Sequence, residues 1–278
     1  MSKVKIIVCC HKPGARPEDE AYLPLQVGRA VACEDMGIAG DDTGDNISSR
    51  NSLYCELTGL YWAWKNLSDA DVVGLCHYRR YFDFHGKCSR WSNAVAIADS
   101  DFSTIDFTID AKTAEQLKSG RAIVARPWRY RYSLMIDYCL NHNSSDFRTL
   151  EQVIAETQPD YREAFYRTMY MGNRLYPYNM LMMCRKDFDA YCSWLFAVLE
   201  QVEQRGVNEP RSIGFMGERL LGVWLAANKI KTITRPVICI TDSAVQIGLL
   251  PPRLQMLHRI QGWLTMKIWY PVTPKGKF

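Results

Sequence analysis

The stretch that decides the fold is residues 71–82, Asp71-Val72-Val73-Gly74-Leu75-Cys76-His77-Tyr78-Arg79-Arg80-Tyr81-Phe82. Its first half is apolar and partly β-branched, which predicts a buried β-strand. It then changes abruptly to a histidine and two arginines between tyrosines. Ligands of open α/β sheets bind beyond the carboxyl ends of the strands, so this strand end predicts a phosphate or diphosphate site. A strand followed by a solvated basic turn is the alternative interpretation.

Around this stretch, strand-like and helix-like patterns alternate along the chain, which is typical of an α/β fold with a largely parallel sheet. Strands are expected over residues 5–10, 71–76, 122–125 and 176–183, with a strand pair within 230–240. Helices are expected over residues 53–65, 111–118, 136–142, 147–156, 161–169, 188–204 and 220–227. The first strand ends in His11 and Lys12, a second set of donors at a strand end.

Composition limits the functions that the chain can have. Of its 278 residues, 47% are hydrophobic and 23% charged, as in an ordinary globular protein. The net charge is only +4, and the Lys and Arg residues are scattered along the chain. No nucleic-acid partner is therefore expected. No apolar run reaches the length of about 18 residues that a membrane-spanning helix needs.

The ten cysteines include no Cys-x-x-Cys pair, and most sit in apolar runs. They are interpreted as small buried residues in a reducing compartment. The first strand follows the N-terminus too closely for a signal peptide. A cytoplasmic protein is therefore expected, with a candidate contact at the inner face of the membrane through its C-terminal tail.

Three sequence runs between Asp45 and Phe82 resemble a bacterial glycosyltransferase family formerly described only as a domain of unknown function. They are DNIS, YCELTGLYWAWKN and VGLCHYRRYF, and HYRRYF is the most specific element. The resemblance continues through Tyr178-Asn179-Met180, FDAYCSWLF and GERLLGVWL, and so covers most of residues 4–240. Members of this family accompany capsule, exopolysaccharide and O-antigen synthesis. The resemblance implies a GT-A-like fold, a Rossmann-type mixed sheet flanked by helices, and sugar transfer from a nucleotide donor.

The resemblance also gives the basic strand end a sharper meaning. In GT-A enzymes the corresponding strand ends in an Asp-x-Asp pair that holds a divalent metal against the donor diphosphate. Residues 76–80 carry no carboxylate, and arginine is a poor ligand for Mg²⁺ or Mn²⁺. We therefore expect metal-independent transfer, with Arg79, Arg80 or both on the diphosphate. A divalent metal at Asp41, Asp42 and Asp45 is the minority alternative.

An inverting transfer needs a base that deprotonates the acceptor hydroxyl. GT-A inverting enzymes place a carboxylate at the start of a late helix, and Glu218, after Gly217, matches that position. A helix dipole there would lower the pKa of Glu218, although the residue could equally be a cap. Asp83 and Asp187 are weaker candidates for the base. Glu218 and Arg79 are the expected catalytic residues.

The remaining site residues follow from the same placement. The expected donor-binding residues are His11, Lys12, Asn46, Asn51, His77, Tyr78, Arg79, Arg80 and Arg219. Trp128, Tyr178 and Asn179 are expected on the acceptor, with the aromatic and basic loop 126–132 stacking on a ring; a mobile surface loop is the alternative there. UDP is the expected nucleotide, and galactose, as pyranose or furanose, the preferred sugar.

The tail forms a separate segment, so we divide the chain into a glycosyltransferase domain, residues 1–250, and a basic amphipathic tail, residues 251–278. Residues 253–270 mix tryptophan, leucine and isoleucine with basic residues, and Lys275 and Lys277 follow. Such a segment can lie on an anionic membrane surface, which would suit a lipid-borne acceptor. Packing on the catalytic domain or on a second subunit is the alternative.

The sequence thus predicts a hexosyltransferase that moves a sugar from a UDP-sugar to a growing surface polysaccharide or a lipid-linked acceptor. Inversion and independence of metal are expected. One alternative is a non-catalytic module that binds nucleotide sugars. The other is a metal-dependent retaining transferase.

Overall fold

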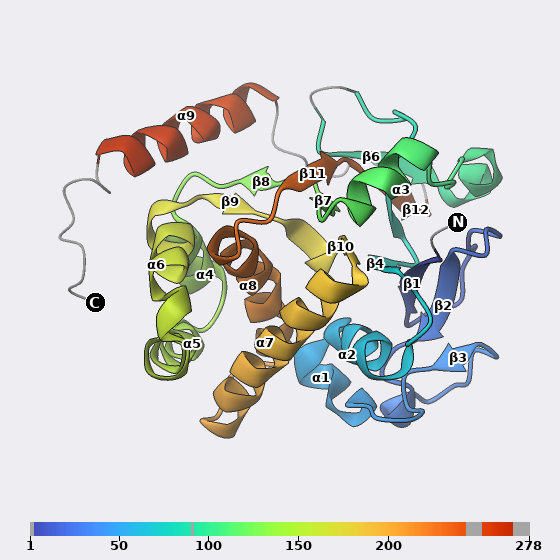
Figure 1. Cartoon of the computed structure of the whole chain (residues 1–278), viewed down its shortest axis with the longest axis horizontal. Helices are drawn as coiled ribbons and strands as arrows, with labels where there is room; N and C mark the ends of the chain where they lie inside the picture. The colour runs from blue at the N-terminus through green and yellow to red at the C-terminus, as the bar shows by residue number, and fades with distance from the viewer. Residues whose placement is uncertain (1–2, 90–91, 243–251, 269–278) are drawn as a thin grey trace.

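The computed structural model describes residues 3–89, 92–242 and 252–268, which form a mixed β-sheet flanked by helices (Figure 1). The main path of the sheet has the strand order β11-β7-β10-β4-β1-β2-β3, and β12 joins it through β5 and also pairs β6. Its neighbours are parallel except around β10, which is antiparallel to both β4 and β7, and around the short β5. The strands are β1 (Val4–Cys10), β2 (Tyr22–Gln26), β3 (Ala39–Gly40), β4 (Val72–His77), β5 (Arg80–Phe82), β6 (Ala94–Ala98), β7 (Ala122–Ala125), β10 (Leu181–Cys184), β11 (Thr232–Arg235) and β12 (Val237–Thr241). A separate ribbon pairs β8 (Trp128–Arg129) with β9 (Arg174–Leu175).

The longest helices cover one face of the sheet (Figure 1). The α-helices are α1 (Asn51–Tyr54), α2 (Leu57–Asn66), α3 (Ala111–Lys118), α4 (Leu134–Asn141), α5 (Ser144–Thr157), α6 (Arg162–Tyr166), α7 (Arg185–Gln204), α8 (Ser212–Ala227) and α9 (Pro252–Ile268). A π-helical turn, Arg167–Met171, continues α6, and a 3-10 turn, Pro177–Asn179, precedes β10.

Both faces of the sheet are buried, because successive side chains of β1 and β4 enter different cores. Ile7 and Leu75 pack with the large helices, whereas Ile6 and Cys76 pack on the other side with β5, β6 and β12. Burial on both faces explains why the strands read as continuous apolar runs. It also means that polar side chains which contact a ligand must come from the strand ends.

The predicted architecture is confirmed: a mixed sheet is flanked by helices, with a helical C-terminal extension. The expected helix over 111–118 and strand over 122–125 match α3 and β7 residue for residue. Strands β2, β3 and β6 were not anticipated, because each is short and β3 and β6 lie among polar or irregular sequence. The proposed boundary at residue 250, together with Lys275 and Lys277, lies outside the described residues.

Two expectations about elements near the site were wrong. The expected helix 53–65 is interrupted at Cys55, whose φ of 52° ends α1 before α2 begins. The expected strand 176–183 shrinks to Leu181–Cys184, because Tyr178 and Asn179 adopt left-handed backbone angles. The two strands expected within 230–240 are present. Pro236 separates them, and they pair with different partners, β11 with β7 and β12 with β5 and β6.

The helix that carries Glu218 begins earlier than the sequence suggested. Gly217 was taken as its opening, whereas α8 begins at Ser212 and Gly217 lies inside it. A Cβ atom on Gly217 would approach Cδ1 of Leu57 to 2.6 Å, so this glycine lets α8 pack closely against α2. Within the described ranges, no helix combines the length and the apolar character needed to cross a membrane.

Candidate active site

The carboxyl ends of β1 and β4 meet at one edge of the sheet, as the sequence predicted. The strands are parallel neighbours, with Cys9 opposite His77, and the Tyr78 N–H donates to the Cys9 carbonyl over 3.1 Å. The His11 ring contacts the Tyr78 ring edge-on, with 4.8 Å between centroids. Burial and then the nearby His77 and Lys12 lower the pKa of His11, so these predicted donor-binding residues share one region.

The two arginines of the motif point to different surroundings, because they belong to a tight hairpin. His77 ends β4 and pairs with Arg80, the first residue of β5. Arg79 lies in the turn and binds Asp242 over 2.6 Å at an exposed position. The Arg80 guanidinium instead lies 4.5 Å from the centroid of the Tyr178 ring. In the described part of the chain Arg80 has no carboxylate partner, which leaves its charge available to an anion.

Tyr178 is the centre of the site, and its backbone is held on both sides. Its φ of 72° is rare for a residue with a side chain and costs conformational energy. The Tyr178 N–H donates to Oε1 of Glu218, and its carbonyl oxygen accepts from Nε2 of His77 over 2.7 Å. The Trp128 ring meets the Tyr178 ring edge-on, with 5.4 Å between centroids. We call His77, Arg80, Trp128, Tyr178 and Glu218 the Tyr178 cluster.

His77 contributes geometry to this cluster rather than positive charge. Since a carbonyl oxygen only accepts, the hydrogen bond to Tyr178 places the proton of the ring on Nε2. Burial lowers the pKa of His77, more than the nearby Glu56 raises it. The imidazole is therefore neutral at pH 7, and His77 adds no positive charge to the strand end.

Glu218 has a perturbed acidity. Burial raises its pKa to about 7, although Arg219 and the hydrogen bond from Tyr178 oppose that shift. The expectation that a helix dipole lowers this pKa was wrong, because Glu218 lies well inside α8 rather than at its N-terminus. Its side chain retains 18% exposure. A half-protonated carboxyl group that solvent can reach is suited to accept a proton near neutral pH.

Arg219 and Asn179 lie beneath the cluster and are occupied by the protein. Nη1 of Arg219 donates to the Phe215 carbonyl over 3.0 Å, and Nη2 lies 3.3 Å from the Asp137 carboxylate. Asn179 is buried and donates from Nδ2 to Oε1 of Glu56 over 2.8 Å. Both residues were predicted to contact substrate, and the structure gives each a supporting position instead.

The polar loop before α1 is held together by its own side chains. Asn46 bonds to Gly44 and Ser48, and Asn51 donates to the Cys55 carbonyl over 2.8 Å. The buried Asp41 carboxylate accepts from the backbone N–H groups of Gly28 and Arg29 and from the Ser48 hydroxyl. The bonds of Asn46 and Asn51 support the loop.

The three aspartates proposed as a metal site do not converge. Asp42 faces Arg29, and Asp45 accepts from the Tyr61 hydroxyl over 3.0 Å. Across residues 3–89, 92–242 and 252–268, no group of three or more His, Cys, Asp or Glu side chains is arranged to hold a metal ion. These donor sets do not fit Mg²⁺ or Mn²⁺.

Two charged residues beside helix ends, Arg211 and Glu56, also belong to this region, and the sequence did not identify Arg211 as part of it. Arg211 has a φ of 66°, and its Nε lies 3.4 Å from Sγ of Cys55. Its charge also contributes to the lowered pKa of His11. Glu56 follows the break at Cys55 and supports Asn179, rather than pairing with an arginine. In the sequence, each of these two residues is only a charged residue beside a helix end. This pattern is too common to indicate a site.

Comparison with known proteins identifies the family to which the chain belongs. Residues 5–229 match the family model described as domain of unknown function DUF4422. The chain belongs to the DUF4422 family. The matched residues include the whole Tyr178 cluster and end shortly after α8, so α9 lies beyond the family model. Among curated proteins no match was found.

One solved structure similar to this DUF4422 chain is the bifunctional glycosyltransferase WbbM in its apo form. The two share 28% sequence identity, and the TM-score is 0.77. The alignment covers 86% of this chain and 45% of WbbM, so the chain spans less than half of that protein. The similarity confirms the GT-A-like fold.

Proposed function

We propose that the chain is a glycosyltransferase whose reaction takes place at the Tyr178 cluster. The observation that carries the proposal is that a cation, Arg80, and a carboxyl group with a raised pKa, Glu218, both contact Tyr178. Arg80, without a carboxylate partner in the described residues, can receive a diphosphate. Glu218, with a pKa raised to about 7, can receive a proton. The similarity to WbbM, which is described as a glycosyltransferase, supports the same reaction class.

The proposed reaction is an inverting displacement. Glu218 removes the proton from an acceptor hydroxyl, whose oxygen forms a bond to the anomeric carbon of the donor sugar. The bond from that carbon to the diphosphate oxygen breaks, and its electron pair leaves with UDP. Arg80 stabilises the charge that develops on the diphosphate. Trp128 provides an aromatic face for a sugar ring, and His77 keeps the Tyr178 backbone in place.

We propose that this transfer does not require a metal ion. The strand end at His77 presents nitrogen donors, and the nearest carboxylates, Glu218 and Glu56, already accept hydrogen bonds from Tyr178 and Asn179. UDP is the proposed nucleotide, with galactopyranose or galactofuranose as the proposed sugar. A surface polysaccharide or lipid-linked saccharide is the proposed acceptor.

The test is a thermal-shift screen of UDP and UDP-sugars, including both galactose forms, in EDTA and in Mn²⁺. Hits then enter a transfer assay that measures UDP release and the anomeric configuration of the product. We expect equal stabilisation and equal transfer in EDTA, with inversion. Transfer that strictly requires Mn²⁺ and retains the anomeric configuration would favour the metal-dependent retaining transferase. Binding without UDP release or transfer, across donors and acceptors, would favour the non-catalytic module.

A further inference from the structure

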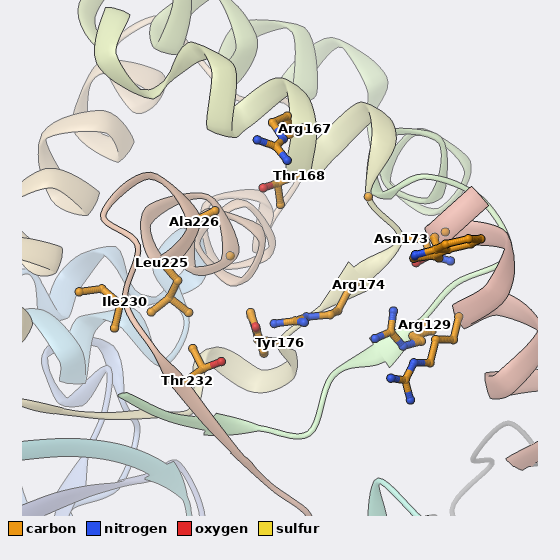
Figure 2. Close-up of a pocket in the computed structure, with 15 residues that line it drawn as sticks. Arg129, Arg167, Thr168, Asn173, Arg174, Tyr176, Leu225, Ala226, Ile230 and Thr232 are labelled. Atoms are coloured by element: carbon orange, nitrogen blue, oxygen red, sulfur yellow. The ribbon is translucent and has the colours of Figure 1, made fainter. Parts of the chain in front are cut away.

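A concentration of arginines lies on the other side of the β8–β9 ribbon from the Tyr178 cluster. Trp128 and Arg129 are consecutive on β8, so their side chains leave opposite faces of the strand. Trp128 meets Tyr178, whereas Arg129 lines two adjoining hollows of about 470 and 1070 Å³. Arg174 and Arg259 line the same two hollows, which we call the arginine pocket. Figure 2 shows the smaller hollow.

The register of the ribbon places two of these arginines against each other. Arg129 of β8 pairs directly with Arg174 of β9, and Figure 2 shows both side chains projecting from these neighbouring strands. Like charges directly opposite each other on a strand pair are destabilising. Burial and the charge of Arg129 lower the pKa of Arg174 to about 10, yet the residue keeps enough exposed surface for a ligand to reach it. The protein tolerates a repulsion that an anion would relieve.

No acidic residue of the chain compensates this charge. Every Asp and Glu lies within the described ranges, and none of them forms an ion pair with Arg129, Arg174 or Arg259. Arg126 and Arg253 also line the larger hollow, and Arg167, which pairs with Glu163 over 3.9 Å, lines the smaller one. After Asp242 the sequence contains no acidic residue at all, so the segment that includes α9 adds only positive charge.

The position of α9 beside the pocket is specific. Nδ1 of His258 donates to the Arg129 carbonyl over 2.9 Å, and Nδ2 of Asn173 donates to the His258 carbonyl over 2.7 Å. A Cβ atom on Gly262 would come within 2.4 Å of Oδ1 of Asn173, so with any other residue here the Asn173 side chain would have to move. These contacts hold Arg259 at the pocket.

The rest of α9 exposes apolar side chains next to this charge. Among the α9 side chains that the structure describes, residues 253–264, the exposed large hydrophobic ones are Leu254, Met256, Leu257, Ile260, Trp263 and Leu264. Leu257, Ile260 and Leu264 follow helical spacing and form one stripe. An apolar stripe beside an unneutralised basic pocket matches the interface of an anionic membrane, where a phosphate lies directly above acyl chains.

We propose that the arginine pocket binds the phosphate or diphosphate group of a membrane lipid, while the apolar stripe of α9 enters the acyl region. The site is separate from the Tyr178 cluster, and its occupation requires no transfer reaction. It would hold the enzyme at the surface where a lipid-borne acceptor is found.

The test is co-sedimentation of the full chain with phosphatidylglycerol vesicles and with phosphatidylcholine vesicles. We expect binding to the anionic vesicles, and a loss of at least about tenfold in affinity for Arg129→Gln/Arg174→Gln. The matched control is Arg121→Gln/Arg148→Gln, which removes the same charge at exposed positions elsewhere and should bind as wild type. Equal losses in both double variants would show that net charge alone drives binding, and would overturn the proposal. If the pocket variant fails to fold, Arg259→Gln on exposed α9 replaces it.

Two further arms separate a lipid from a soluble phosphate. Leu257→Ser/Leu264→Ser should lose vesicle binding but retain pyrophosphate binding, measured in an Arg80→Ala background so that the Tyr178 cluster does not contribute. UDP affinity of the pocket variant should equal that of wild type. Arginine-dependent pyrophosphate binding without vesicle binding would mean that the ligand is soluble, which contradicts the lipid assignment. Failure of the proposed transfer reaction would leave these vesicle results unchanged.

Discussion

The two faces of the β8–β9 ribbon place arginine in contrasting electrostatic surroundings. On the Tyr178 face, Arg80 lies over an aromatic ring in a cluster that also contains a proton-accepting carboxyl group. On the opposite face, Arg129, Arg174 and Arg259 gather without any acidic residue. A site with both charge types can move a proton and stabilise a leaving group, whereas a site with one sign can only hold a ligand. We therefore propose that the reaction takes place on the first face and that the second face binds a ligand.

The largest effect expected from this contrast is that of Glu218→Gln. The amide oxygen of glutamine can still accept from the Tyr178 N–H, so the fold should persist, but the base is lost. We expect transfer to fall by about 10²- to 10⁴-fold at saturating substrate, measured as initial rates. Glu203→Gln is the control, since Glu203 is a carboxylate bonded to Arg50 and Tyr54 outside the cluster. A folded Glu218→Gln protein with the wild-type rate would remove Glu218 from the mechanism.

The next largest effect is on UDP binding, and it should differ between the two adjacent arginines of the hairpin. Arg80→Ala should weaken UDP binding by about 10- to 100-fold, as expected for the loss of a hydrogen bond to a charged group. Arg79→Ala should change it by no more than about threefold, because Arg79 lies at the surface in an exposed ion pair with Asp242. Isothermal titration of UDP measures both. An equal loss in the two variants, or a larger loss for Arg79→Ala, would show that the diphosphate lies on the turn.

The smallest effect concerns stability, and compares two glycines of α8. Gly217→Ala places a Cβ atom 2.6 Å from buried Leu57, beneath the Tyr178 face, and should lower the free energy of unfolding by about 1–3 kcal/mol. Gly222→Ala lies on the side of the arginine pocket, where the nearest atom is 3.5 Å away. It should be neutral or stabilising, since alanine favours helix over glycine. Denaturant titration of both variants tests this, and equal destabilisation would show that α8 does not depend on the Leu57 contact.

The sequence predicted the parts of the site that follow from strand direction. His11, Lys12, His77 and Tyr78 each follow or end a strand, and parallel strands bring such ends together whatever the details of packing. The place of Glu218 in a late helix was also predicted correctly, while its role as the base stays a prediction. Local patterns were sufficient because each of these positions depends on one element at a time.

The features that the sequence did not predict depend on contacts between distant segments. Gly217 looked like the start of a helix, but α8 begins at Ser212 and runs through it, and the glycine permits the close approach to Leu57. The adjacent arginines of the hairpin were treated as one group, although a two-residue turn sends them to different partners. The pairing of Arg129 with Arg174 follows from the register of a ribbon whose strands are two residues long, too short to leave a periodic signal.

The most direct test of the central claim is the pH dependence of kcat/KM for transfer. Glu218 acts only when ionised, and its pKa is raised to about 7, so the rate should fall as the pH is lowered through about 7. His11 and His77 should not contribute to this limb, because the pKa of each is lowered and both rings are already neutral there. The residual rate of Glu218→Gln should lack the limb. A wild-type rate that stays constant down to about pH 5, the range of an ordinary glutamate, would contradict the account.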